Sequence, residues 1–263
     1  MTKAIFFDID GTLVSFDTHQ IPASTVEAIA AAHARGIRMF IATGRAPGFI
    51  NNLGALQDRG LIDGYVTMNG GYCYVGDEVL HKQVIPAPEV KAILDYCEAH
   101  RITCTVVDEH HICACYPSEA LRRVFVEYLH AKEVPGVTPA EALRLIPDVC
   151  QLSPFFDEEQ EREIRPLLPN CEIGRWHPAF VDVSALGCNK QLGIDLMCRR
   201  FGIDVTDTMA IGDGGNDIPM LRHAGIGVAM GNANETVKAE ADYVTDTVDQ
   251  DGIAKALQHF GLV

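Results

Sequence analysis

Short apolar runs alternate with amphipathic stretches over the first third and the last third of this chain. The stretch at residues 22–35 predicts a helix, because Pro22 suits its first turn and Gly36 suits its end. A further helix is expected from about residue 47. Strands that alternate with helices predict an α/β fold with a doubly wound, mostly parallel sheet. The strand-like runs lie at residues 5–7, 38–42, 65–68 and 209–211.

The pattern changes over residues 83–183. Two strand-like runs, at residues 103–107 and 112–116, lie close together between helical stretches. Strands that are joined by a short turn favour an antiparallel α+β unit over a βαβ unit. We therefore predict two domains: a core formed by residues 1–82 and 184–263, and an inserted α+β domain formed by residues 83–183.

Two carboxylates follow the first apolar run, in the segment Asp8-Ile9-Asp10-Gly11-Thr12. Side chains of an extended segment alternate between its faces, so Asp8 and Asp10 begin on the same side. Two like charges repel each other unless a cation neutralises them or one carboxyl holds a proton. The pair therefore favours a carboxylate nucleophile beside an acid/base on a magnesium site. An ordinary acidic turn after a strand is the alternative.

Polar and glycine-rich segments follow other apolar runs as well. Thr43-Gly44-Arg45 offers a hydroxyl, a flexible backbone and a fixed cation, which suit a phosphate. Lys190 opens an amphipathic stretch and could hold an anion beside the start of that helix. Residues 212–217 read Gly-Asp-Gly-Gly-Asn-Asp and add oxygen ligands that suit magnesium. Each segment could instead be a turn, a solvated charge or a helix cap, but their shared position after strand-like runs favours one phosphate site.

These four motifs resemble those of the haloacid dehalogenase (HAD) superfamily of phosphohydrolases, and in particular the Cof-like family with a type-IIB cap. The resemblance implies a Rossmann-like HAD core, with residues 83–183 as an α+β cap domain. Two positions depart from the family pattern: Asn189 stands where Ser is usual, and Gln191 stands where Gly is usual. Further matches lie at residues 68–71, 227–233 and 251–254.

The residues and the resemblance agree on a mechanism. Asp8 would attack phosphorus, Asp10 would act as acid and then base, and Lys190 would neutralise the nucleophile and a phosphate oxygen. Mg²⁺ would be held by the Asp8 carboxylate, the Asp10 backbone carbonyl and Asp213. Asp217 would orient the residues around the metal rather than ligate it. The residues expected to bind the phosphate are Ile9, Asp10, Thr43, Gly44, Arg45, Lys190 and Asn216.

The resemblance indicates a class of substrate and not an individual compound. A type-IIB cap closes over the site and contacts the leaving group, which makes sugar phosphates the default among small phosphate monoesters. Arg175-Trp176-His177 is a candidate contact for that group, although Trp176 is equally suited to a core. A phosphomutase of the same superfamily and a non-catalytic phosphate-ligand sensor are the alternative functions. A sensor has no need of a nucleophile together with its acid/base.

Composition restricts the partners and the location of the protein. The net charge is −15 and Lys and Arg form no cluster, which argues against nucleic acid and anionic membranes as partners. Neither a signal peptide nor a membrane-spanning run is expected. Nine cysteines without regular spacing indicate reduced thiols. We expect a cytoplasmic enzyme whose partner is a small-molecule phosphate ester, with no obligate protein partner.

Overall fold

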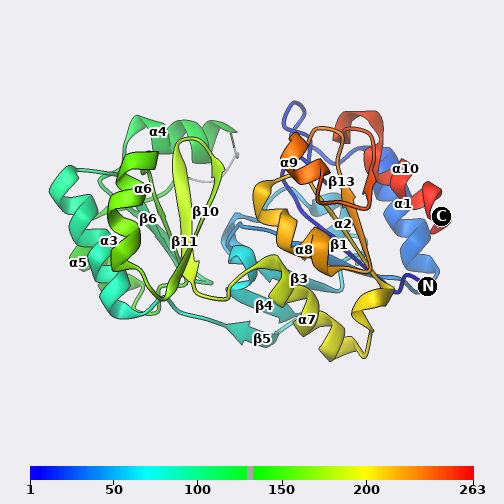
Figure 1. The fold of residues 1–263 in the computed structure, drawn as a ribbon, viewed down its shortest axis with the longest axis horizontal. Helices are drawn as coiled ribbons and strands as arrows, with labels where there is room; N and C mark the ends of the chain where they lie inside the picture. The colour runs from blue at the N-terminus through cyan, green and yellow to red at the C-terminus, as the bar shows by residue number, and fades with distance from the viewer. Residues whose placement is uncertain (129–132) are drawn as a thin grey trace. The chain divides into compact units, whose positions relative to one another are not determined.

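A computed structural model describes residues 1–128 and 133–263, except for the side chains of Tyr128 and Trp176. The chain forms two compact units, each of which contains its own sheet (Figure 1). Unit 1 consists of Met1–Thr43, Asn51–His81 and Asn189–Val263, and unit 2 consists of Gly44–Ile50 and Lys82–Cys188.

Unit 1 is built on an eight-stranded sheet in the order β14-β13-β12-β1-β2-β3-β4-β5. The strands from β14 to β3 run parallel, and β4 is antiparallel to β3. Every residue of β1 is buried, because a parallel sheet is covered on both faces. The predicted doubly wound, mostly parallel sheet is confirmed. The strands are β1 (Ala4–Phe7), β2 (Arg38–Ala42), β3 (Gly64–Thr67), β4 (Tyr72–Val75), β5 (Glu78–Lys82), β12 (Thr208–Gly212), β13 (Ile226–Ala229) and β14 (Tyr243–Val244).

Helices cover both faces of this sheet. Phe6 and Phe40 stack on each other and pack with residues of α7 and α8 on one face. On the other side α1 contacts β2 and packs against α10. The helix expected from about residue 47 is wrong in extent, since only the 3₁₀ turn Pro47–Phe49 forms there and Gly48 interrupts the helical stretch. The helices are α1 (Ala23–Ala34), α2 (Gly54–Gln57), α7 (Lys190–Phe201), α8 (Ile218–His223), α9 (Glu235–Lys238) and α10 (Gly252–His259).

The strand order gives the unit 1 sheet a switch point beside β1. β1 lies between β2, which follows it in sequence, and β12, which comes much later in the chain. Helices on the two sides of such a point diverge, and ligands of open α/β sheets bind there, at the carboxyl ends of the strands. Asp8 follows β1, Thr43 follows β2 and Asp213 follows β12, so these side chains meet at that edge.

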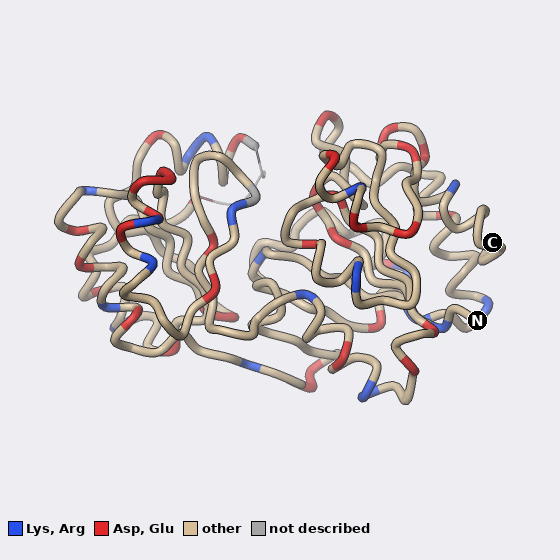
Figure 2. Tube along the Cα trace, viewed as in Figure 1, with Lys and Arg blue, Asp and Glu red and all other residues tan. Residues whose placement is uncertain are grey.

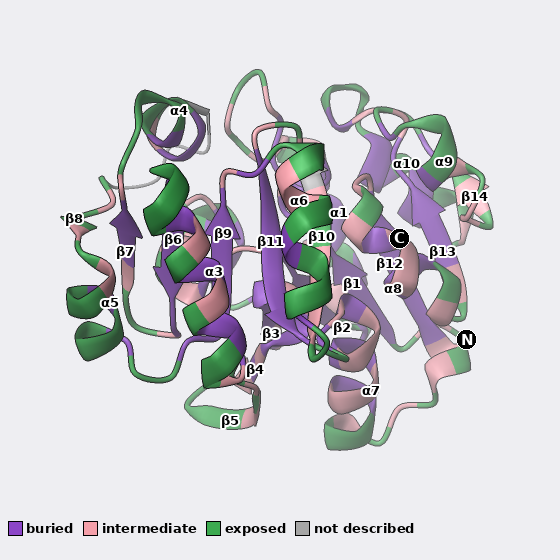
Figure 3. Cartoon of the chain, turned by 60° about the vertical axis from the view of Figure 1, so that its left-hand side comes forward, coloured by how far each residue is buried: buried purple, intermediate pink, exposed green. Residues whose placement is uncertain are grey.

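Unit 2 contains a six-stranded sheet in the order β10-β11-β9-β6-β7-β8. Its neighbours pair antiparallel except for β7 and β8, in agreement with an α+β unit. Helix α3 packs on β9, and these elements enclose an apolar core (Figure 3). The strands are β6 (Cys104–Val107), β7 (Ile112–Cys115), β8 (Gly136–Val137), β9 (Gln151–Pro154), β10 (Cys171–His177) and β11 (Phe180–Ala185). The helices are α3 (Ala87–His100), α4 (Glu119–Leu121), the π-helical turn Arg122–Tyr128, α5 (Pro139–Leu145) and α6 (Glu158–Ile164).

The two faces of the unit 2 sheet differ in chemistry. Alternation along each strand places Cys104, Val106, Leu152, Val181 and Val183 toward the apolar core. The intervening residues face the other way, and they include the buried polar side chains of β6, β9 and β11. These buried polar residues are Thr105, Gln151, Ser153, Asp182 and Ser184.

Charge and hydropathy are distributed as the composition suggested. Figure 2 shows Lys and Arg interspersed among more numerous Asp and Glu in both units. None of the helices in residues 1–128 and 133–263 has the length and apolar character that crossing a membrane requires. All nine cysteines are free thiols.

Candidate active site

The centre of the site is a buried ion-pair triad of Asp8, Lys190 and Asp217. Asp8 emerges from the end of β1, and Lys190 is the first residue of α7. The Lys190 Nζ donates to Asp8 Oδ1 at 2.6 Å and to Asp217 Oδ1 at 2.5 Å. The side chains of Lys190 and Asp217 are fully buried, and that of Asp8 is 10% exposed. Buried ion pairs of this kind are stable only with good geometry. Burying each charge costs several kcal/mol, and the attraction between the opposite charges must offset that cost.

Asp217 is committed to holding the loop that follows β12. Its Oδ2 accepts the backbone N–H groups of Asp213 and Gly214, at 2.9 and 2.8 Å. Its Oδ1 accepts from Lys190. A Cβ on Gly212 would lie 2.5 Å from the Asp217 carboxyl carbon, so glycine permits this close approach. Asp217 therefore orients the loop and the lysine.

Asp213 lies between the β1 loop and the β12 loop. Its Oδ1 accepts from the Thr12 hydroxyl at 2.8 Å, and its Oδ2 lies 3.3 Å from the Asn232 amide nitrogen. The same Asn232 amide donates to the Gly11 carbonyl at 2.8 Å. A Cβ on Gly11 would come within 2.3 Å of Asp213 Oδ2, and the backbone there has a φ of +80° that favours glycine. These contacts fix the direction in which the Asp213 carboxylate points.

Burial and neighbouring charges shift the pKa values of the side chains at this site. Removal from water, together with the Asp217 and Asp213 carboxylates, raises the pKa of Asp8 against the opposing effect of Lys190. Burial and the nearby Asp217 raise the pKa of Asp213 to about 7. Burial lowers the pKa of Lys190, but Asp217 and Asp8 outweigh it and leave that pKa above its usual value. Three carboxylates and one ammonium give this cluster a net charge of −2.

The cluster has the composition of a divalent-cation site. Carboxylate oxygens of Asp8, Asp213 and Asp217 all lie within 4.8 Å of one another. Hard oxygen donors suit Mg²⁺ and Ca²⁺, and a cation would remove the excess negative charge that burial penalises. The residues present therefore fit a metal ion, with Asp213 and the Asp8 oxygen that does not pair with Lys190 as its carboxylate ligands, since both oxygens of Asp217 already accept from Lys190 and the loop backbone.

Helix α7 positions Lys190 despite the departures from the family pattern. Asn189 is its N-cap and accepts from the Leu192 N–H at 2.9 Å, the contact that a Ser at this position would also make. The helix ends at Gly202, which adopts the left-handed conformation with a φ of 66°. The Asn at this position therefore conserves the cap. The Gln at position 191 lies one residue further into the first turn of the helix.

Thr43 and Asn216 flank the triad in unit 1. Thr43 directly follows β2 and is 1% exposed, and its N–H donates to the Val66 carbonyl at 2.8 Å. Asn216 lies in the turn Gly215–Asp217, where its amide nitrogen donates to the Asn69 Oδ1 at 3.0 Å. Asp10 comes at the tight turn after Ile9, where the Gly11 N–H donates to the Val14 carbonyl at 2.9 Å.

Gly44 and Arg45 group with unit 2, although they follow Thr43 in the chain. The Arg45 guanidinium donates to the Phe49 carbonyl at 2.9 Å. Arg45 also lines a pocket on the polar face of the unit 2 sheet, which we call the unit 2 pocket. Among the residues that line this pocket are Arg45, Phe49, Thr105, Gln151, Phe180 and Asp182.

Polar side chains of three adjacent strands form the floor of the unit 2 pocket. Asp182 Oδ1 accepts from the Gln151 amide at 3.0 Å and from the Ser153 hydroxyl at 2.8 Å. Two buried oxygens there, Gln151 Oε1 and Thr105 Oγ1, make no hydrogen bond with any described residue. Buried polar atoms without a partner are rare in folded proteins, and a ligand is one explanation.

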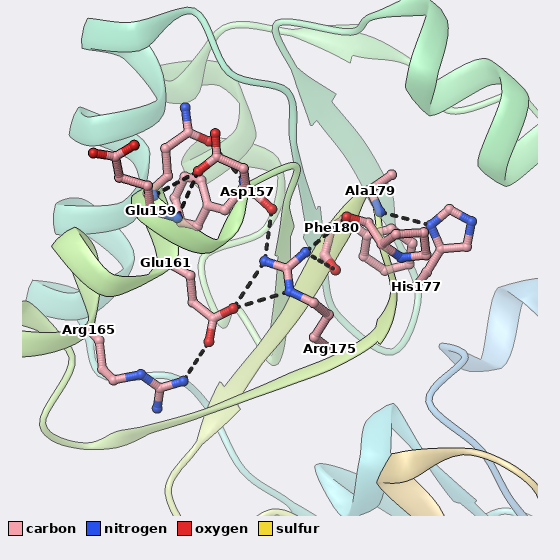
Figure 4. A network of polar contacts seen from close by, with 11 residues as sticks. Asp157, Glu159, Glu161, Arg165, Arg175, His177, Ala179 and Phe180 are labelled. Carbon is pink, nitrogen blue, oxygen red and sulfur yellow. Dashed lines mark hydrogen bonds and ion pairs between the residues drawn. The ribbon is translucent and has the colours of Figure 1, made fainter. Parts of the chain in front are cut away.

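Arg175 has a structural role in unit 2 and is not available to a leaving group. Figure 4 shows its guanidinium enclosed between α6 and the β10–β11 hairpin. It pairs with Glu161 at 3.0 Å and donates to the Phe156 carbonyl at 2.9 Å. His177 lies at the hairpin end, where its Nδ1 accepts from the Ala179 N–H at 3.1 Å and burial lowers its pKa. The side chain of Trp176 lies outside the described part.

Sequence reasoning gave no role to three residues that contact the site. Thr12 and Asn232 hold Asp213, and Asn69 holds Asn216. All three lie inside segments that match the family motifs, at residues 8–12, 68–71 and 227–233. The match was therefore a signal for them, but the partners of Thr12 and Asn69 lie 201 and 147 residues away in the chain, where no local pattern indicates them.

The match to a family model agrees with this geometry. The model of the haloacid dehalogenase-like hydrolases covers residues 5–257. The chain belongs to this family, which confirms the resemblance drawn from the motifs. Asp8, Asp213 and Lys190 therefore occupy a fold whose members are hydrolases.

Individual relatives place the chain among the phosphatases of the superfamily. The solved structure of the HAD subclass IIB sugar phosphatase BT4131 is 58% identical, covers 100% of both chains and superimposes with a TM-score of 0.96. The putative phosphatase YkrA of Bacillus subtilis (strain 168) is 31% identical over 100% of this chain and 99% of its own. A phosphoglycolate phosphatase of Methanopyrus kandleri is 31% identical over 98% of this chain and 97% of its own.

Proposed function

We propose that this protein is a Mg²⁺-dependent phosphatase that hydrolyses sugar phosphates, and related small phosphate monoesters, through an aspartyl-phosphate. The observation that carries the proposal is the cluster in which three carboxylates, Asp8, Asp213 and Asp217, gather around the single ammonium of the buried Lys190. A carboxylate held in this way is poised to attack phosphorus once the excess charge is neutralised. When bound, Mg²⁺ would supply that neutralisation, and Asp8, Asp213 and the Asp10 backbone carbonyl would hold it.

The reaction proceeds in two steps on Asp8. In the first step an Asp8 carboxylate oxygen bonds to phosphorus, the ester P–O bond breaks, and the Asp10 carboxyl gives its proton to the departing alcohol. In the second step Asp10 takes a proton from water, the resulting hydroxide bonds to phosphorus, and the Asp8–phosphorus bond breaks to release phosphate. Lys190 stabilises the charge on Asp8 and on a phosphate oxygen throughout.

Phosphate binding is assigned to donors around the triad. Thr43 and Asn216 follow β2 and β12 in unit 1, and both offer side-chain donors to phosphate oxygens. The backbone N–H groups of Ile9 and Asp10 are further donors, because they lie in the turn directly after the nucleophile. Gly44 and Arg45, which follow Thr43 in the chain, are the remaining residues assigned to phosphate binding.

The unit 2 pocket supports a leaving group rich in hydroxyls. Gln151 Oε1 can only accept hydrogen bonds and has no donor among the described residues, so a donor on the ligand would satisfy it. Phe49, Phe125 and Phe180 provide an apolar wall. Hydroxyl donors beside C–H faces are what a sugar offers. In this proposal, residues 83–183 form the cap domain that selects the substrate.

The test is phosphate release from a panel of esters by the intact protein, with Mg²⁺ and then with a chelator. We expect chelator-sensitive release that is faster from hexose and pentose phosphates than from phosphoglycolate or nucleotides. Release that a chelator leaves unchanged would exclude the metal. Absence of release across the panel, with folded protein and Mg²⁺ present, would exclude the phosphatase.

A further inference from the structure

The turn at the end of β3 is the most strained backbone segment of unit 1. Met68, Asn69 and Gly70 have φ values of 49°, 52° and 97°, so three consecutive residues are left-handed. Only glycine adopts this conformation without steric cost, and a buried Met does so only where its surroundings require it. Strain of this kind persists where the structure around it fixes the turn, which directs attention to what the turn contacts.

The turn contacts three of the segments assigned to phosphate chemistry. The Asn69 N–H donates to the Thr43 carbonyl at 3.0 Å. A Cβ on Gly70 would lie 2.3 Å from the Asn189 carbonyl oxygen, next to Lys190, so the backbones touch there. The Asn69 Oδ1 accepts from the Asn216 amide at 3.0 Å. The turn therefore contacts the residue after β2, the residue before α7 and the loop after β12.

The Asn69 contact fixes the orientation of the Asn216 amide. One N–H of that amide donates to Asn69, and its Oδ1 lies against the backbone of Gly214, where a Cβ would be only 2.6 Å away. These two contacts hold the amide plane and leave the second N–H as the donor to a phosphate oxygen. Without Asn69 the same amide could rotate about its side-chain torsions, and the donor would lose its fixed direction.

We propose that Asn69 is a positioning residue, which acts on the phosphate through Asn216, and that the Met68–Gly70 turn joins three phosphate-binding segments into one rigid unit. The inference rests on the proposed function, because it assumes that Asn216 binds phosphate. Asn69 itself does not contact the reacting atoms.

The experiment measures binding of orthovanadate to intact protein with Mg²⁺, by thermal shift titration, alongside kcat and KM for the best sugar phosphate. Asn69→Gly keeps the left-handed backbone and removes the side chain. We expect it to weaken orthovanadate binding by about tenfold. Asn216→Ala should weaken orthovanadate binding to a similar extent. The double variant should bind no more weakly than Asn216→Ala alone, because both changes remove the same interaction.

Two further variants separate positioning from general stability. Asn69→Asp keeps an acceptor oxygen and tolerates a positive φ, so it should bind orthovanadate more tightly than Asn69→Gly. Asp251→Gly changes another left-handed residue of unit 1, with a φ of 62°, and should leave orthovanadate affinity unchanged even if the melting temperature moves.

The outcomes distinguish this inference from the proposed function. Unchanged orthovanadate affinity in Asn69→Gly, or additive losses in the double variant, would overturn the positioning role. If the unmodified protein binds orthovanadate but hydrolyses no ester, the proposed function fails while the variants still decide the role of Asn69. If the unmodified protein binds no orthovanadate, both are overturned.

Discussion

The ion-pair triad of unit 1 and the unit 2 pocket bury polar side chains in different ways. In unit 1, Asp8, Lys190 and Asp217 are ionisable, and each makes a hydrogen bond to another member of the triad. In unit 2, Gln151 and Thr105 are neutral, and each retains a buried oxygen without a partner. A polar group whose hydrogen bonds are made within the protein is already in position before the ligand binds. A polar group that lacks a hydrogen bond gains one from the ligand.

This difference suits the two halves of a phosphate ester. The phosphoryl half is the same in every substrate, so a preformed charged site serves all of them. The leaving group varies, so discrimination depends on hydrogen bonds that only some ligands can complete. The four predictions below test this comparison, beginning with the charged cluster.

Removal of the nucleophile should have the largest effect. Asp8→Asn keeps the shape of the side chain but removes the attacking carboxylate, so turnover should fall by at least about a thousandfold. The measurement is steady-state phosphate release, with circular dichroism as the control for folding. Asp10→Ala should instead retain a burst of phosphorylation without turnover. A substantial residual rate in Asp8→Asn would contradict the aspartyl-phosphate.

Removal of the buried cation should destabilise unit 1. Lys190→Met leaves Asp8 and Asp217 buried without their partner, and the free energy of unfolding should fall by about 3–5 kcal/mol. Urea denaturation at a pH where both carboxylates are ionised measures this change. Lys255→Met is the matched control, because Lys255 is an exposed lysine that pairs with Asp246. An equal decrease in the free energy of unfolding in both variants would show that burial does not increase the cost of removing the lysine.

Changes in the unit 2 pocket should alter selectivity rather than the chemical step. Gln151→Leu removes an acceptor that is buried in the pocket, so kcat/KM for a sugar phosphate should fall by about tenfold. The rate for phosphoglycolate should change little, because its carboxylate has no hydrogen to donate. Ratios of kcat/KM for the two esters measure this. Equal losses for both esters would place Gln151 outside leaving-group recognition.

The smallest effect expected is a pH dependence of stabilisation by metal. The pKa of Asp213 is raised from 3.8 to about 7, so the folded chain holds its proton more tightly than the unfolded chain does. Asp8 is shifted in the same direction. The free energy of unfolding without metal should therefore fall as the pH rises through this window.

Mg²⁺ competes with those protons for the same oxygens. The increase in melting temperature caused by Mg²⁺ should therefore be larger at about pH 8 than at about pH 5.5, by a few degrees. Differential scanning calorimetry with and without Mg²⁺ measures it, and Asp213→Asn is the control that should remove the difference. A larger increase at the lower pH would contradict the assignment of Asp213 as a metal ligand.

Much of unit 1 could be predicted because its signals are local. The run at residues 38–42 coincides with β2, and the helix predicted from Lys190 to about Phe201 coincides with α7. Each strand is a short apolar run, and each site motif directly follows one in the chain. The helix expected from about residue 47 failed because Pro47 and Gly48 allow only a 3₁₀ turn.

The sequence by itself determined which chemistry this protein carries: carboxylates after β1 and β12, a hydroxyl after β2, and a lysine at the start of α7. Only the tertiary structure decided that Asp217 holds the loop backbone, that Arg45 lines a pocket of unit 2, and that Arg175 is committed to Glu161. It also decided the partners of Asn69 and Gln151. The physical reason is that local patterns show which segments form strands and helices, whereas a side chain's partner depends on which distant segments the sheet brings together.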